Sequence, residues 1–257
     1  MISPGAPDWL RPFADGTWPA ALRGCVTTRR DASGEDFDLG GAAPTPAAAA
    51  RRAGLAARLG IERVRFLRQV HGTTVVRVAG GDGGPEPEAD GAVTEAVGTA
   101  LAILTADCLP VLFVDRAGTR VGAAHAGWRG LAAGVLEATV AAMERPAEDI
   151  LAWLGPAIGP DGYEVGPEVR AAMRTARSTV ATRRALDRAL RPGRGDRWHL
   201  DLAALAATRL EALGLGRVAS AGIDSRQDVR RFHSHRRDGE AAGRQAALVW
   251  LSPRRRS

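Results

Sequence analysis

Three short apolar runs follow one another between residues 99 and 127, and they constrain the fold more than any other feature of the chain. They read TALAILTA, LPVLFVD and TRVGAAHAG, and turn residues bound each of them. Continuous apolar runs of this length are typical of strands that are buried on both faces. The sequence therefore predicts a sheet that other elements cover on both sides.

Helical patterns alternate with further strands over the rest of the chain. Residues 45–60 read as a helix that Thr45 caps, with Pro46 in its first turn and Gly60 as its stop. Residues 128–144 place their apolar side chains on one helical stripe, which predicts a single helix that starts just after His125. Other patterns predict extended pieces on either side of Gly72, strands at 150–156, 217–223 and 244–251, and helices at 166–177 and 201–214. This order indicates one α/β domain with a mixed sheet over residues 1–257, including an irregular part at 1–46 and a basic tail at 252–257.

Arginine alone supplies the positive charge of the chain, since none of its 35 basic residues is lysine. The net charge is +6, but the arginines lack interleaved aromatic residues that could stack on bases, so we expect solvated helix faces and no nucleic-acid partner. No apolar run approaches the ~20 residues of a membrane span, and the first residues lack the pattern of a secretory signal. We therefore expect a soluble, cytoplasmic protein without membrane contact.

A cysteine and two histidines lie where apolar runs meet turns. Cys108 lies between the first two runs, His125 ends the third, and His71 lies at the turn near Gly72. Cysteine and histidine on converging strand ends suit zinc, and three ligands would leave one position open, as in catalytic sites. The spacings of 37 and 17 residues match no short-spaced zinc template, so a buried inert thiol with structural histidines is the alternative.

Five motifs occur in a fixed order between residues 66 and 251. They are RQVHG, TADCLPVLFVD, AAHAGWRGL, LGPAIGPDGYEVGPEV and FHSHRRDGEAAGRQAALVWL. Together they resemble the YfiH-like laccase-domain family, also called polyphenol oxidase-like or peptidoglycan editing factor proteins. The resemblance implies mixed β-sheets layered between helices, in the order α/β/β/α, and a zinc ion held by His71, Cys108 and His125.

The resemblance also implies an activity. Members of the family resemble purine nucleoside enzymes that phosphorolyse adenosine and related nucleosides, including methylthioadenosine, and that deaminate adenosine. The implied small-molecule partners are therefore a nucleoside and phosphate. Some bacterial members are linked instead to editing of peptidoglycan precursors, which leaves a hydrolase as the alternative function. Polyphenol oxidation ranks lower, because a multicopper oxidase needs on the order of ten histidines and this chain has five, so we expect zinc rather than copper.

Further residues fit the implied chemistry. Asp107 can move protons during attack at C6 of adenine, although capping a turn is an equal interpretation. Arg129, at the predicted helix start, can bind phosphate. A metal-free hydrolase with Cys108 as nucleophile and His125 or His71 as base is the closest rival, since it uses the same residues. The segment FHSHRRDG supplies additional candidates for the substrate pocket, namely Ser234, His235, Arg236 and Arg237.

Overall fold

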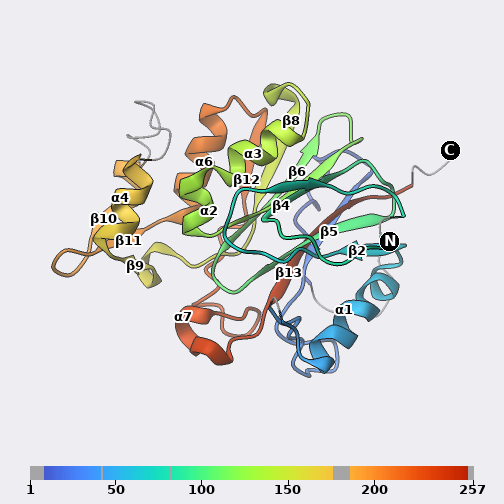
Figure 1. Ribbon diagram of the computed structural model, residues 1–257, viewed down its shortest axis with the longest axis horizontal. Helices are drawn as coiled ribbons and strands as arrows, with labels where there is room; N and C mark the ends of the chain where they lie inside the picture. The colour runs from blue at the N-terminus through green and yellow to red at the C-terminus, as the bar shows by residue number, and fades with distance from the viewer. Residues whose placement is uncertain (1–8, 42, 82, 176–185, 254–257) are drawn as a thin grey trace.

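Two mixed β-sheets packed face to face form the centre of the structure, and helices cover the outer face of each (Figure 1). The computed structural model describes residues 9–41, 43–81, 83–175 and 186–253. The layers follow the order α/β/β/α, so the predicted fold class is confirmed. Within the described residues, no helix is long and apolar enough to cross a membrane.

The four-stranded sheet joins distant parts of the chain. Its strands lie in the order β1 (Leu22–Val26), β13 (Gln245–Leu251), β5 (Thr99–Thr105) and β2 (Arg63–Arg65). Strand β13 runs antiparallel to β1 and β5, whereas β2 runs parallel to β5. Helix α1 (Pro46–Leu59) packs its buried Leu55 and Leu59 on the outer face of this sheet. As predicted, Thr45 caps the helix and Gly60, with a φ of 64°, ends it.

The six-stranded sheet carries two of the three central apolar runs. Its strands lie in the order β12 (Arg217–Ser220), β8 (Ile150–Leu154), β6 (Leu109–Asp115), β7 (Val121–Ala126), β4 (Gly91–Thr94) and β3 (Val75–Arg77). The outer pairs, β12 with β8 and β3 with β4, are parallel, and the inner pairs are antiparallel. Three helices pack on the outer face of this sheet: α2 (Trp128–Ala133), α3 (Val135–Ala142) and α6 (Leu202–Ala212).

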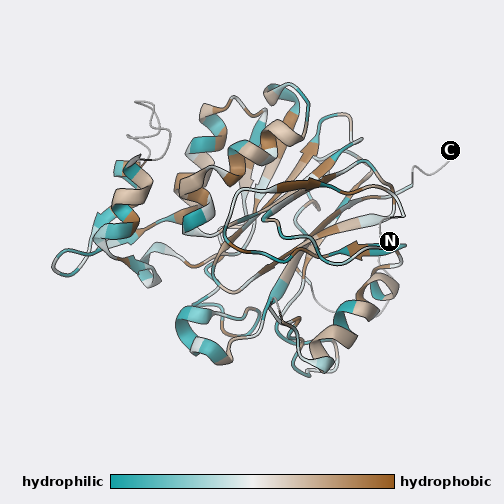
Figure 2. Cartoon of the chain, viewed as in Figure 1, coloured by the Kyte–Doolittle hydropathy of each residue, from teal (hydrophilic) through white to brown (hydrophobic). Residues whose placement is uncertain are grey.

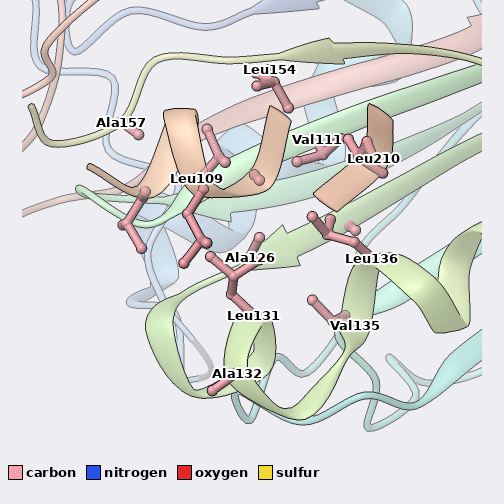
Figure 3. Packing of buried hydrophobic residues seen from close by; sticks show 14 of the residues in the cluster. Leu109, Val111, Ala126, Leu131, Ala132, Val135, Leu136, Leu154, Ala157 and Leu210 are labelled. Atoms are coloured by element: carbon pink, nitrogen blue, oxygen red, sulfur yellow. The ribbon is translucent and has the colours of Figure 1, made fainter. Parts of the chain in front are cut away.

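The surroundings of strand β6 explain why its run is almost entirely apolar. Its Leu112 and Val114 belong to the core between the sheets, whereas Val111 and Phe113 belong to the core under the helices. Figure 3 shows the helix side, where Val111 lies among leucines of α2, α3 and α6. Because both faces are buried, residues 109–114 are all apolar, and the carboxylate of Asp115 at the end of the strand is buried with hydrogen bonds from the N–H groups of Thr119 and Arg120. Figure 2 shows that the two large sheets are largely hydrophobic, whereas helix α7 (His235–Asp238) is hydrophilic.

A small third sheet extends from the main body (Figure 1), and the sequence patterns did not predict it. Its strands have two or three residues each, which is too short for a periodic pattern: β10 (Leu190–Pro192), β11 (Trp198–Leu200) and β9 (Glu164–Val165). The predicted helix at 166–177 is α4 (Pro167–Thr175). Residues 176 and 177 of that prediction, and 254–257 of the predicted basic tail, lie outside the described residues. Short 3₁₀ helices also occur: η1 (Ala147–Asp149), η2 (Pro160–Gly162) and η3 (Gly239–Ala241).

The prediction of a single helix over residues 128–144 is wrong, because the structure has two helices there. Gly134 adopts a φ of 103°, and its N–H group donates to the carbonyls of Gly130 and Leu131 at the end of α2. Helix α3 starts immediately afterwards, at Val135. Glycine reaches this left-handed conformation without a steric clash, so it ends one helix while the apolar stripe continues into the next.

Candidate metal centre

The three predicted metal ligands converge on one point from separate elements. His71 lies in the connection between β2 and β3, Cys108 in the connection between β5 and β6, and His125 in β7. Because β7 pairs antiparallel with β6, His125 lies opposite Pro110, close to Cys108 in the chain. The ligand atoms of the three side chains lie within 4.8 Å of one another, and Cys108 Sγ is 3.9 Å from His71 Nε2. Burial increases from His71 through Cys108 to His125.

The buried carboxylate of Asp90 positions both histidines, and no sequence motif pointed to this residue. Its Oδ1 atom accepts the N–H of His71 at 2.9 Å and lies 2.8 Å from His125 Nδ1, so the Nε2 atom of His125 is left to bind a metal. Its Oδ2 atom accepts the N–H groups of Val70 at 3.1 Å and Gly72 at 2.7 Å. A carboxylate behind a ligating histidine is a recurrent support of metal sites, because it fixes the orientation of the ring.

The backbone adopts an unusual conformation at His71 and at Asp107, the residue before Cys108. His71 has a φ of 63° and Asp107 a φ of 90°, in the left-handed region that residues other than glycine rarely adopt. The consecutive N–H groups of residues 70–72 surround the Asp90 carboxylate and hold His71 in this conformation. Asp90 therefore fixes the backbone of one ligand and the ring of the other.

A glycine leaves room for the ligands to approach one another. Gly127 follows the last residue of β7, and an ideal Cβ atom on it would lie 2.8 Å from His71 Cδ2 and 2.9 Å from Cys108 Sγ. Both distances are too short for real Cβ contacts. Any larger residue at position 127 would therefore displace two of the three ligands.

The donor set fits a divalent metal such as zinc. In a tetrahedral zinc site with bonds of ~2.0–2.3 Å, neighbouring ligand atoms lie roughly 3.3–3.6 Å apart. The 3.9 Å between Cys108 Sγ and His71 Nε2 needs only a small contraction to reach that range. Two imidazoles and a thiolate are ligands that zinc prefers, and a set of three leaves one coordination position open.

Opposite charges favour the metal-binding form of the cysteine. Burial disfavours the Cys108 thiolate, but the charge and hydrogen bond of His125, aided by His71, outweigh burial and lower the pKa of Cys108 to about 6. Burial also disfavours the protonated ring of His125, but Cys108 and Asp90 outweigh it and raise the pKa of His125 to about 9. At neutral pH this pair is therefore a thiolate beside a protonated imidazole. The thiolate is the form of cysteine that binds metals, and the proton on His125 would leave as a metal binds.

The ligands line a cavity of about 390 Å³ whose other charged residues are basic. Arg129 and Arg244 line this cavity, and none of the lining residues that the structure describes is a carboxylate. The Arg129 guanidinium lies 4.4 Å from the ring centroid of Trp128, which lines the cavity too. Arg244 Nη1 donates to the carbonyls of Ala242 at 2.6 Å and Gly243 at 3.0 Å. No sequence pattern singled out Arg244, and its place directly before the last strand is the signal that could have indicated it.

The structure divides five of the other predicted site residues into two groups. Arg129 and His235 line the cavity, as expected of substrate-binding residues. Asp107, Ser234 and Arg236 lie outside its lining and contact one another. The Asp107 carboxylate accepts the N–H of Arg236 at 2.7 Å and the Ser234 hydroxyl at 3.0 Å.

Arg237, predicted to contact substrate, is held within its own segment. Its Nε and Nη2 atoms donate to the Asp238 carboxylate at 2.8 and 2.7 Å. Its Nη1 atom donates to the carbonyl of Arg226 at 3.0 Å, and Nη2 also donates to that of Phe232 at 3.0 Å. Because every nitrogen of the guanidinium already has a protein partner, we assign Arg237 to the structure of this segment.

Comparison with known proteins identifies the family of the chain. A family model described as multi-copper polyphenol oxidoreductase laccase matches residues 35–252. The chain belongs to this family. The copper in the laccase description does not fit the histidines, since a multicopper oxidase needs on the order of ten and this chain has five. Among the described residues, His71, Cys108 and His125 form the single metal-binding group of this kind.

Relatives of the chain within the laccase family carry the name of another activity. A purine nucleoside phosphorylase of Pseudomonas aeruginosa is 45% identical over 249 residues, which are 95% of this chain and 98% of that protein. The purine nucleoside phosphorylase YfiH of Escherichia coli is 43% identical over 190 residues, or 72% of this chain and 73% of that protein. A solved DUF152-family protein of Neisseria meningitidis superposes with a TM-score of 0.85 at 39% identity, covering 96% of this chain and all 100% of that one. The predicted resemblance to YfiH-like proteins is thus confirmed.

Proposed function

We propose that this protein is a zinc-dependent purine nucleoside phosphorylase that acts on adenosine and related nucleosides, including methylthioadenosine. The observation that carries the proposal is the cavity beside the metal centre, which combines Arg129, Arg244 and His235 without a carboxylate among its described lining residues. A pocket of this charge suits phosphate, which must be bound beside the nucleoside. The names of the relatives from Pseudomonas aeruginosa and Escherichia coli support the same activity.

Phosphorolysis needs a bound anion and a leaving purine. An oxygen of phosphate forms a bond to C1′ of the ribose while the C1′–N9 bond breaks. The purine leaves with the bonding electrons and takes up a proton, so the products are the free base and ribose 1-phosphate. Arg129 binds the phosphate through two of its N–H groups, and Arg244 adds a second positive charge in the same cavity. Packing of Arg129 on the Trp128 ring restricts the guanidinium before phosphate arrives.

His71, Cys108 and His125 would hold the zinc ion, which supplies Lewis acidity at its open position when bound. Asp90 keeps the imidazole ring of His125 oriented and holds the backbone of His71. The cavity volume of about 390 Å³ falls in the range of ~300–1,000 Å³ that is typical of small-molecule sites. The site is therefore large enough for a nucleoside-sized ligand beside the metal.

Deamination of adenosine, the second activity implied by the resemblance, is not part of the proposal. That expectation depended on Asp107 as a proton carrier near the metal ligands. The Asp107 carboxylate instead accepts hydrogen bonds from Ser225, Ser234 and Arg236, and it does not line the cavity. The observations thus favour phosphorolysis.

Product analysis with and without phosphate tests the proposed reaction. The zinc-loaded protein is incubated with adenosine, and the products are separated by chromatography. We expect adenine and ribose 1-phosphate in equal amounts, and only when phosphate is present, because phosphate is the nucleophile. Adenine release that does not depend on phosphate, or inosine as the sole product, would contradict the proposal.

Metal analysis separates the proposal from its closest rival, a metal-free hydrolase with Cys108 as nucleophile. A thiol nucleophile needs one base, whereas two imidazoles converge on Cys108, which favours a metal. We expect about one zinc ion per chain, as a three-ligand site binds a single ion, and loss of that zinc in the Cys108→Ala variant. Full activity after removal of zinc by a chelator would support the rival instead.

A further inference from the structure

Asp107, the neighbour of the metal ligand Cys108, connects the metal centre to a distant segment. Its side chain is buried, with 8% exposure, and its carboxylate accepts hydrogen bonds from residues more than a hundred positions away in the sequence. Oδ2 accepts the N–H of Arg236 at 2.7 Å and the hydroxyl of Ser234 at 3.0 Å, and Oδ1 accepts the hydroxyl of Ser225 at 2.8 Å. These bonds fix the helix α7 beside the cysteine.

Helix α7 presents a cavity-lining residue between the two groups that Asp107 binds. His235 lines the cavity, and Ser234 and Arg236 flank it in the chain. The Ser234 side chain also accepts the N–H of Arg237 at 3.2 Å and thus caps the helix. The hydrogen bonds from Ser234 and Arg236 to Asp107 therefore determine where His235 stands.

Apart from Asp107, polar contacts of Arg236 and Arg237 hold the helix, and Arg237 donates to the carbonyls of Arg226 and Phe232. The helix spans only His235–Asp238 and contains no buried residue, so apolar packing does not anchor it. The Arg236 guanidinium lies 5.2 Å from the ring centroid of Tyr163 and donates to the carbonyl of Glu164 at 3.2 Å. These two contacts hold the exposed side chain of Arg236, whereas the hydrogen bond from its N–H group to Asp107 holds the backbone.

We propose that Asp107 is a positioning residue, which sets the distance between the metal centre at Cys108 and the cavity wall at His235. It acts through α7 and not as a proton carrier, because its acceptor oxygens face three donors of the protein. The effect on substrate rests on the proposed function, but the effect on α7 does not. The two effects can therefore be tested separately.

The Asp107→Asn variant tests the effect on α7 by hydrogen–deuterium exchange. Asparagine tolerates the left-handed backbone that Asp107 adopts, but its amide replaces one acceptor with a donor that faces other donors. We expect exchange in residues 232–241 to become at least roughly tenfold faster, the size expected for loss of a buried bond to a charged group. Asp201→Asn is the matched control, because Asp201 caps α6 and lies outside the metal cavity, and it should leave this segment unchanged. Unchanged exchange in Asp107→Asn would overturn the proposal.

Kinetics and a double-mutant cycle test the effect on substrate. In Asp107→Asn we expect the KM for adenosine to rise roughly tenfold, with zinc content and kcat close to those of the parent protein. Ser234→Ala should raise KM as well, and the two changes together should raise it less than the product of their separate effects, because they act through the same bond. A fall in kcat at constant KM, or independent effects, would overturn the proposal. Absence of phosphorolysis in the parent protein would instead refute the proposed function and leave the exchange result valid.

Discussion

The candidate metal centre depends on residues that are not themselves proposed ligands. Asp90 binds the ring of His125 and the backbone of His71, so one buried carboxylate positions two of the three ligands. Gly127 provides the space in which Cys108 and His71 come together, because a side chain there would overlap both. At the scale of single residues, the site is therefore as sensitive to its supports as to its donors.

The Gly127→Ala variant tests this view of the site. The added Cβ atom would lie 2.8 Å from His71 Cδ2 and 2.9 Å from Cys108 Sγ, so both ligands must move apart. We expect the affinity for zinc to fall by roughly 10–100-fold, as it does when the support of a ligand is lost. Calorimetric titration with zinc measures this change. Gly41→Ala is the control, since Gly41 also lines the cavity but has nothing within 4 Å of its added Cβ atom, and equal affinities in the two variants would contradict the account.

The sequence indicated the three residues that converge at this site but not the residues that support them. Cys108, His71 and His125 attract notice because the chain has only two cysteines and five histidines. Asp90 reads as an ordinary loop residue before a strand, and its role appears only when β4 pairs with β7 and the 70–72 turn folds over it. Arg244 likewise enters the cavity from the start of β13, far along the chain from the ligands.

At the scale of elements, glycines decide where helices end. The apolar stripe of residues 128–144 continues through Gly134, so periodicity alone predicts one helix. The break depends on a φ of 103°, which a hydrophobic pattern does not encode. Helix α1 and strand β6 were predicted correctly for the converse reason, because burial of one face of α1 and of both faces of β6 determines their sequence patterns.

A pair of glycine variants tests the element boundaries. Gly134→Ala should lower the free energy of unfolding by about 1–2 kcal/mol, because alanine at this left-handed position is strained. Gly54→Ala should raise it by about 0.5–1 kcal/mol, since Gly54 lies inside α1 and its added Cβ atom would meet open space. Urea unfolding monitored by circular dichroism measures both values. A stabilised Gly134→Ala variant would mean that α2 and α3 are one helix in solution.

At the scale of the whole molecule, the site joins the two sheets. Cys108 lies on the connection between β5 of the four-stranded sheet and β6 of the six-stranded sheet, whereas His125 belongs to β7. Sequence patterns predicted an α/β fold with buried strands but not this division into sheets. The division depends on pairings between distant segments, such as β1 with β13, which local patterns do not reveal.

The rate of adenine release from adenosine, measured against phosphate concentration, tests directly whether phosphate is the nucleophile. For the zinc-loaded protein we predict no release without phosphate and a rate that saturates as phosphate increases. For Arg129→Ala, with its zinc content verified, we predict at least a roughly tenfold higher KM for phosphate, because one charge-assisted pair is lost. Release that is independent of phosphate in the parent protein, or an unchanged phosphate dependence in Arg129→Ala, would contradict the account.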